Sequence, residues 1–398
     1  MRTKNMSLLW IILLITSLLL SGCGPGQLFG PTLTSTPTNT ATATITPTLT
    51  PTLTPTLTST PTLTPTQTPT RTRTPTPRPP TITPTPTEDA YAIATPMAPR
   101  IGQENAIVVE GFDGFAISLA WSTDGKFLFI GTKENGLVAY DVANNELGPY
   151  VGDGASIQAL AVSPDGEILA MGLGNDGSIR FLSIATGYLE RTIWPAHDDW
   201  VQVLAFNPAG NLLVSGGDDG QLILWDVATG EMVTTLLQDS GFIWGAAFSP
   251  DGKTLIAGTQ FQMTFYVWNT ETWELLQTYE GDITADLAFS PDGRFFATAG
   301  GTWHEANLWN AQTGKLVYNF SEMPGWVWAI AYDPNGRYVA AGGIGQAVVL
   351  WDTRTGQPAY ELYTGADFLQ ALAFSPDGTK LASGGSEVII WDMSQLEP

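Results

Sequence analysis

Few side chains in this sequence could carry out nucleophilic or metal chemistry. It contains two histidines, His197 and His304, and a single cysteine, Cys23. A serine nucleophile would need one of these histidines as its base, and a zinc site usually needs three or four His, Cys or acidic ligands together. Because the two histidines lie far apart, we expect no catalytic dyad, no metal and no cofactor. A site made only of carboxylates stays open, since acidic residues are abundant.

The elements that must position such side chains are short strands joined by tight turns. Residues 197–230 contain the apolar runs VLAF, LLVS and LILW, separated by Asn207-Pro208-Ala209-Gly210 and by Gly216-Gly217-Asp218-Asp219-Gly220. Both separators are rich in residues that form turns between strands. The stretch therefore predicts three antiparallel strands, and close relatives of it recur to the end of the sequence.

The repeat has a nearly constant length. Its turn glycine recurs at Gly125, Gly166, Gly210, Gly252, Gly293, Gly336 and Gly378. The steps between neighbouring glycines are 41, 44, 42, 41, 43 and 42 residues. A period of about 42 residues with a Trp-Asp ending is typical of the blades of a β-propeller.

Trp-Asp or Trp-Asn pairs close most of the repeats. They stand at 225–226, 268–269, 309–310, 351–352 and 391–392. At these residues the chain resembles the WD-repeat β-propeller family, over about residues 105–395. The resemblance implies an all-β fold of seven four-stranded antiparallel blades, in which the first and last segments of the chain share one blade. Residues 106–110 would then supply the N-terminal strand that closes the last blade.

The same resemblance assigns a structural role to four polar residues of one repeat. In the family, a His before the first strand, a Ser or Thr on the second, an Asp in the following turn and the Trp of the third form a hydrogen-bonded set. The matching residues here are His197, Ser215, Asp219 and Trp225. A buried indole N–H and imidazole need hydrogen-bond partners, so we interpret His197 as structural rather than catalytic.

Aromatic residues recur at the entrance to the first strand of each repeat. The position before that strand holds Phe115, Ser156, Trp200, Phe242, Ile283, Trp326 and Phe368, and Trp244 and Trp328 follow two places after their entries. Acidic residues of the same loops are Asp113, Asp153, Asp198, Asp199, Asp239, Asp282 and Asp367. We call Phe115, Trp200, Phe242, Trp244, Trp326, Trp328 and Phe368 the rim aromatics. They predict a docking surface, although packing into the channel mouth or between blades remains an equal alternative.

The composition limits the partners of such a surface. The chain has 38 acidic and 16 basic residues, a net charge of −22, and Arg2, Lys4, Arg71, Arg73, Arg78 and Arg100 all precede the repeats. Binding to phosphate requires clustered Lys and Arg. Nucleic acid and a bare anionic membrane are therefore not expected as direct partners of the propeller.

The N-terminal segment resembles the export signal of a bacterial lipoprotein. Arg2 and Lys4 precede an apolar run at 7–20, which is short for a membrane span but suits a signal peptide, and Leu20-Ser21-Gly22-Cys23 follows. The resemblance implies that residues 1–22 are removed and Cys23 is acylated, with an uncleaved anchor as the alternative. The Thr/Pro-rich tract that follows should be an extended linker without a core. We expect lipid-anchored residues 23–100 and a propeller at 101–398 on the extracytoplasmic face of a bacterial envelope.

The sequence therefore predicts a tethered binding module. The propeller, expected to be monomeric, would dock a protein, or a saccharide, through the rim aromatics. The alternative is an extracytoplasmic hydrolase or lyase with a carboxylate-based site in the central opening. Exposed aromatics ringed by charge would favour the first function, and converging titratable groups would favour the second.

Overall fold

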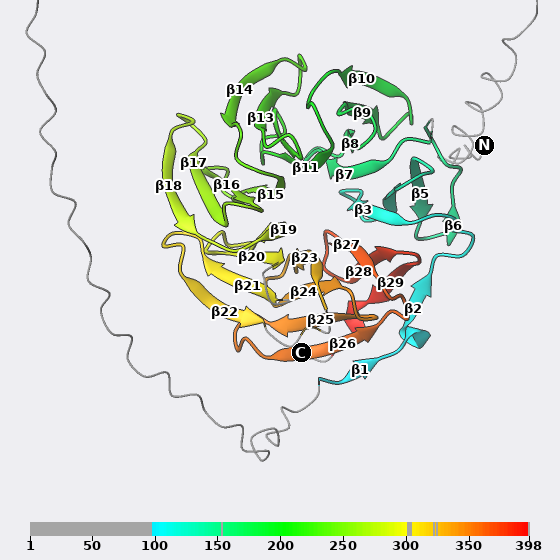
Figure 1. Ribbon diagram of the computed structural model, residues 1–398. Helices are drawn as coiled ribbons and strands as arrows, with labels where there is room; N and C mark the ends of the chain where they lie inside the picture. Colours follow the sequence, from blue (N-terminus) through cyan, green and yellow to red (C-terminus); the bar gives the residue numbers. More distant parts are fainter. Residues whose placement is uncertain (1–97, 153, 301–304, 321–322, 324, 397–398) are drawn as a thin grey trace, which may run out of the picture. The chain divides into compact units, whose positions relative to one another are not determined.

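The computed structural model describes residues 98–152, 154–300, 305–320, 323 and 325–396. These residues form seven sheets, each with four antiparallel strands, arranged as blades around a central opening (Figure 1). The predicted seven-bladed, all-β propeller is confirmed. The predicted signal peptide at 1–22, the predicted acylation site Cys23, the predicted linker as far as residue 97, Asp153 and His304 lie outside the described residues.

Each blade runs outward from an inner strand at the opening to an outer strand at the periphery. Blade 1 consists of β3 (Ala116–Trp121), β4 (Phe127–Thr132), β5 (Leu137–Asp141) and β6 (Glu146–Leu147). Blade 2 consists of β7 (Ile157–Val162), β8 (Ile168–Leu173), β9 (Ile179–Ser183) and β10 (Leu189–Ile193). Blade 3 consists of β11 (Val201–Phe206), β12 (Leu212–Gly217), β13 (Leu222–Asp226) and β14 (Met232–Leu237). Blade 4 consists of β15 (Ile243–Phe248), β16 (Thr254–Thr259), β17 (Thr264–Asn269) and β18 (Leu275–Glu280). Blade 5 consists of β19 (Thr284–Phe289), β20 (Phe295–Gly300), β21 (Glu305–Asn310) and β22 (Leu316–Phe320).

The last two blades include the N-terminal strands. Blade 6 consists of β23 (Val327–Tyr332), β24 (Tyr338–Gly343), β25 (Ala347–Asp352), β26 (Pro358–Tyr363) and β1 (Arg100–Ile101), and blade 7 of β27 (Leu369–Phe374), β28 (Lys380–Gly385), β29 (Val388–Asp392) and β2 (Ala106–Val108). Two short 3-10 helices, η1 (Gln103–Asn105) and η2 (Met393–Gln395), flank this closure. None of the described helices has the length and apolar character that crossing a membrane requires.

Turn chemistry accounts for the bends between the first and second strands. The repeated turn glycines have φ between 68° at Gly125 and 76° at Gly166 and Gly336. Glycine adopts this left-handed conformation without the steric strain that a side chain would cause. In blade 2 the turn is fixed by Ser163, whose hydroxyl donates to Oδ1 of Asp165 at 2.5 Å. That hydrogen bond, with a backbone one, lowers the pKa of Asp165. The aspartates of the Pro-Asp-Gly turns are therefore occupied in holding the hairpins.

Neighbouring blades pack through glycines near the end of most second strands. A Cβ at Gly172 would lie 2.8 Å from Cγ1 of Val201 on the inner strand of blade 3, and one at Gly216 would lie 2.7 Å from Cγ2 of Ile243 in blade 4. Only a residue without a side chain admits this approach. The second strands are accordingly buried along most of their length, and the apolar core lies between successive sheets.

The N-terminal strands connect two blades. β2 pairs with β29 through Ala106↔Trp391, Ile107↔Ile390 and Val108↔Ile389, which confirms closure of the last blade. β1, which was not predicted, pairs in parallel with β26 at the edge of blade 6. Arg100 also forms a 2.6 Å ion pair with Glu361. The segment thus reaches blade 6 one residue before the predicted start of the propeller.

Candidate functional site

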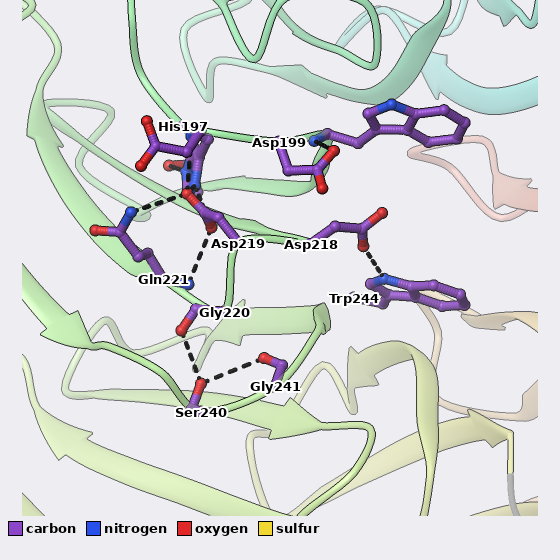
Figure 2. Close-up of polar contacts among 12 residues, drawn as sticks. His197, Asp199, Asp218, Asp219, Gly220, Gln221, Ser240, Gly241 and Trp244 are labelled. Atoms are coloured by element: carbon purple, nitrogen blue, oxygen red, sulfur yellow. Dashed lines mark hydrogen bonds and ion pairs between the residues drawn. The ribbon is translucent and has the colours of Figure 1, made fainter.

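The candidate site lies at the end of the ring where the inner strands begin, which we call the rim face. One blade fixes the loops of this face through the polar set expected there. His197 Nε2 lies 2.7 Å from Ser215 Oγ, and Trp225 Nε1 donates to the same hydroxyl at 2.8 Å. His197 Nδ1 lies 3.0 Å from both carboxylate oxygens of Asp219 (Figure 2). Every polar atom of the two buried rings therefore has a partner.

This set positions the loop that carries Trp200. The Asp219 carboxylate also accepts the backbone N–H of Asp198 at 3.0 Å, and the N–H of Asp218 donates to the carbonyl of Trp200 at 3.0 Å. Burial alone would raise the pKa of Asp219, but its hydrogen bonds from His197 and the backbone lower it instead. Asp219 is therefore an ionised anchor, and its neighbours Asp218 and Trp200 are held at the channel mouth.

The rim aromatics differ in how far they face solvent. Trp326 is 56% exposed and Trp200 is 43% exposed, whereas the other rim aromatics are partly buried. Packing as core therefore does not describe the two exposed tryptophans. Exposed indoles of this size at one end of a ring form an apolar surface with a polar surround.

Six of the rim aromatics contact one another, and three of these contacts cross blade boundaries. Ring centroids are separated by 5.6 Å for Phe115 and Phe368, 6.0 Å for Phe368 and Trp328, 6.1 Å for Trp328 and Trp326, 5.9 Å for Trp328 and Trp244, and 6.1 Å for Trp244 and Phe242. The stacked pair Trp244–Trp328 joins blades 4 and 6 past the small Ala285 of blade 5, which lines the same channel. One aromatic surface therefore runs over blades 4, 6, 7 and 1.

A cavity of about 450 Å³ occupies the channel beneath this surface. The second residue of every inner strand lines it: Ile117, Gln158, Gln202, Trp244, Ala285, Trp328 and Gln370. Three amides, two indoles and two aliphatic side chains thus line its mouth. Trp200 and Asp218 reach the same cavity from the rim loops.

Asp218 is the acidic group most closely tied to the tryptophans. Its Oδ1 atom accepts the indole N–H of Trp244 at 2.6 Å (Figure 2). Its Oδ2 atom accepts the side-chain amide of Gln202 at 2.9 Å. Burial raises the pKa of Asp218, and the charge of nearby Asp199 adds to that increase. Figure 2 shows the Asp199 carboxylate near that of Asp218, which lies between Asp199 and the indole of Trp244. The mouth therefore holds a partly buried carboxylate, Asp218, close to an exposed one, Asp199.

A second carboxylate lies within the channel wall. Asp286 of β19 accepts the backbone N–H of Leu287 at 2.8 Å and that of Ile330, on the inner strand of blade 6, at 3.0 Å. Burial raises its pKa to about 6. Asp286 is the third residue of its inner strand, where the other blades have small or aliphatic residues such as Ala159. The carboxylate is therefore particular to blade 5, and it gives the backbone N–H of Ile330 a hydrogen-bond partner.

Sequence reasoning missed Asp218 and Asp286 as lining groups, and it missed Phe261. Asp218 was interpreted only as part of a turn. Phe261, in the turn after β16, is 68% exposed and lies 5.0 Å from the ring of Phe242. The signal that could have found Asp286 was its position, since a carboxylate stands where the other repeats have small or aliphatic residues.

The rim face is acidic throughout. The described acids of its loops are Glu110, Asp113, Glu134, Asp176, Asp198, Asp199, Asp218, Asp219, Asp239, Asp282, Asp367 and Glu387. Within the described residues of these loops, Lys133 is the sole Lys or Arg. At the opposite end, by contrast, Lys126, Arg294 and Arg354 form ion pairs with turn aspartates of their own blades. The rim loops therefore carry little positive charge of their own, although Arg180 of β9 reaches Asp176 of a rim loop at 3.7 Å.

No group of three or more His, Cys, Asp or Glu among the described residues is arranged to hold a metal ion. The geometry of the rim face is instead that of a surface with exposed indoles, hydrogen-bonded amides and carboxylates. Such groups orient a bound partner through stacking, hydrogen bonds and charge.

The chain is similar to several curated repeat proteins. It is 32% identical over 175 residues to an uncharacterised WD repeat-containing protein of Synechocystis, which is 43% of this chain and 49% of the relative. It is 30% identical to the small ribosomal subunit protein RACK1 of Glycine max, over 37% of this chain and 43% of that relative. It is 26% identical to the periodic tryptophan protein 2 homolog of Dictyostelium discoideum, over 47% of this chain and 20% of that relative. Each match thus covers less than half of the relative.

The family assignment comes from the repeats themselves. A model described as the WD domain, G-beta repeat, matches residues 145–182, 187–226, 230–269, 273–310, 314–352 and 356–392. These segments include most of the seven blades and more than half of the chain. The chain therefore belongs to the WD40 repeat family.

Proposed function

We propose that this protein is a membrane-tethered, extracytoplasmic binding scaffold that docks a protein partner on its rim face. The observation that carries the proposal is the exposure of Trp200 and Trp326 beside the continuous aromatic surface. Buried anchors at interfaces are enriched in tryptophan, and a polar rim usually surrounds them. The acidic loops provide that surround here.

The tether is proposed from sequence. Cys23 follows an apolar run at the distance of a lipoprotein cleavage site, and the Thr/Pro-rich tract separates it from the propeller. Acylation at more than one position would give firm retention, whereas one chain alone binds membranes only marginally. The propeller would then stand away from the bacterial envelope with its rim face available to a partner.

The carboxylate-based hydrolase or lyase has weaker support from the geometry. Asp218 and Asp286 both line the channel, and burial raises the pKa of each. However, each oxygen of both carboxylates accepts a hydrogen bond from a protein donor. These groups are engaged in fixing Trp244 and the inner strand of blade 6, so we favour docking over acid–base catalysis.

The test uses single alanine variants of Trp200 and Trp326 in the full chain. Exposed residues usually change stability by no more than about 0.5 kcal/mol, so both variants should melt like the parent. A partner captured from the cell envelope should bind them at least about tenfold more weakly, equivalent to roughly 1.4 kcal/mol. Equal binding by parent and variants, with folding intact, would remove the support for docking.

Tyr188→Ala is the matched control. Tyr188 is 54% exposed, so truncating it removes a comparable aromatic surface, but it lies between β9 and β10 at the end opposite the rim face. Partner affinity should not change in this variant. Equal weakening by the control would indicate that the loss reflects general surface hydrophobicity.

A further inference from the structure

Resting on the proposed function, we propose that the mouth of the central cavity accepts a positively charged side chain, arginine or lysine, from a basic segment of the partner protein. The site consists of Trp200, Trp244, Asp199 and Asp218, with the Trp328 indole beside them. Each of these residues contributes a separate feature, and together they define the chemistry of the ligand.

The first feature is uncompensated negative charge. Asp218 accepts hydrogen bonds only from the neutral donors Trp244 and Gln202, and Asp199 accepts one from the backbone N–H of Trp200 at 2.9 Å. Among the ion pairs of the described residues, none involves Asp199 or Asp218. A carboxylate has further acceptor capacity after two hydrogen bonds, so a cation can be added without displacing either donor.

The second feature is an indole held in a fixed orientation beside that charge. The 2.6 Å hydrogen bond to Asp218 fixes the edge of Trp244, while Phe242 stacks on the ring with an interplanar angle of 4°. Trp200, 43% exposed, lines the same cavity. Its ring packs closely on Gly174, since a Cβ added to that glycine would lie 3.3 Å from Cδ2 of Trp200. The face of an indole attracts guanidinium or ammonium groups, most strongly when they are partly desolvated.

The third feature points to a peptide rather than a free cation. The indole N–H of Trp328 is buried and has no hydrogen-bond partner among the described residues. Buried polar groups are normally satisfied, so an isolated donor at a binding cavity calls for an acceptor from outside. A backbone carbonyl next to the cationic side chain supplies one, and Trp328 lines the cavity together with Trp244.

The fourth feature is the acidic rim as a whole. Loops of successive blades carry acids, while the described cations of the opposite end are largely paired within their own turns. A face of one sign attracts oppositely charged partners and accelerates their association at low salt. It also opposes anionic ligands, so a neutral saccharide stacked on the tryptophans is the remaining competitor.

The experiment measures binding of a defined probe to the full chain. The probe is an acetylated and amidated nonapeptide with two arginines between glycines, and its counterpart has citrulline, which keeps the shape of arginine but has no charge. Isothermal titration calorimetry should show at least about tenfold tighter binding of the arginine peptide. Raising the salt from about 50 to 500 mM should weaken it, because screening shortens the range of the attraction. No binding of the arginine peptide, or equal affinity for both peptides, would overturn the proposal.

Two charge-removing variants locate the site. Asp218→Asn keeps an acceptor for Trp244 but loses the charge, and Asp199→Asn changes an exposed carboxylate that bonds only its neighbouring backbone N–H. Each should weaken the arginine peptide at least about fivefold with an unchanged melting transition. Glu231→Gln is the control, since Glu231 is exposed at the opposite end and its loss removes the same charge. If Asp199→Asn binds the peptide as the parent does, or if the control weakens binding equally, the cation site is wrong.

Failure of this inference is distinguishable from failure of docking itself. If the captured partner loses affinity for Trp200→Ala and Trp326→Ala but not for Asp199→Asn, docking stands and the cation site falls. If the partner is indifferent to all of these variants, docking on the rim face falls as well. A neutral oligosaccharide that competes with the arginine peptide would instead identify stacking as the source of affinity.

Discussion

The indole N–H of Trp244 donates a 2.6 Å hydrogen bond to Oδ1 of Asp218, across the boundary between blades 4 and 3. Trp244 is on the inner strand β15, and Asp218 is in the turn between β12 and β13. The bond therefore couples the orientation of a channel-lining ring to the turn that the His197–Asp219 pair holds in place. Stability of blade 3 and geometry of the rim face are linked through adjacent residues of one turn.

Ser215→Ala should destabilise the protein by about 1 to 3 kcal/mol. The substitution leaves both His197 Nε2 and Trp225 Nε1 buried without their shared partner, and an unsatisfied buried polar group costs its desolvation energy. Denaturant unfolding measures the loss. Ser383→Ala is the comparison. That hydroxyl accepts the Trp391 indole N–H at 3.2 Å and donates to the carbonyl of Ile389 at 3.5 Å, so its loss leaves no histidine unpaired and should cost less. Equal losses would contradict a cooperative set in blade 3.

Removal of both N-terminal strands should open the ring. A chain that starts at residue 98 keeps β1 and β2, whereas one that starts at residue 115 leaves the edge of β29 unpaired. Exposed strand edges promote aggregation. Size-exclusion chromatography and thermal unfolding should show a cooperative monomer for the first chain and aggregation or non-cooperative unfolding for the second. Identical behaviour would mean that β2 is dispensable for closure.

Asp286→Asn should change how stability depends on pH. The pKa of Asp286 is about 6 in the folded protein against an ordinary value of 3.8, so the folded state binds more protons between these values. Stability therefore decreases as pH rises through roughly 4 to 6, and the parent loses roughly 1 to 3 kcal/mol relative to the Asn variant. Urea unfolding of both proteins at several pH values measures this difference. A constant difference across the window would show that Asp286 does not titrate there.

Cys23→Ser should abolish acylation. Cys23 is the single cysteine of the chain, so a clickable fatty-acid analogue supplied to the expressing cells has one thiol to modify. The parent should incorporate the label and partition with membranes, and the Ser variant should do neither. Equal labelling of the two proteins would show that the lipoprotein interpretation of this segment is incorrect.

The fold could be predicted because its determinants repeat along the chain. Turn glycines such as Gly166 and Gly210 mark each hairpin between the first and second strands, and Trp-Asp or Trp-Asn endings mark most of the third strands. The period and the number of repeats follow from these positions. The polar set of His197 and Asp219 was also accessible, since all its members lie within one repeat. Strand β1 was not, because a two-residue parallel pairing has no pattern of its own.

The candidate site was only partly predictable. The positions of the rim aromatics follow from the repeat, but their exposure depends on loops from neighbouring blades. The bond between Asp218 and Trp244, and that between Asp286 and the N–H of Ile330, join different blades. Residue types in one sequence do not show which donor a carboxylate faces after the ring closes, and that donor decides both its pKa and its function.

The pairing of β1 with β26 also determines how the ring responds to mechanical force. Tension applied along the chain before residue 98 reaches the Pro99 carbonyl, which accepts the N–H of Glu361 at 3.0 Å, and then the Arg100–Glu361 ion pair. Only after these contacts yield does the pull reach β2 and its pairs with β29. The pairing of β1 with blade 6 therefore protects the closure of blade 7 from a pulling force. Such a force would detach the edge strand β1 before it could separate β2 from β29.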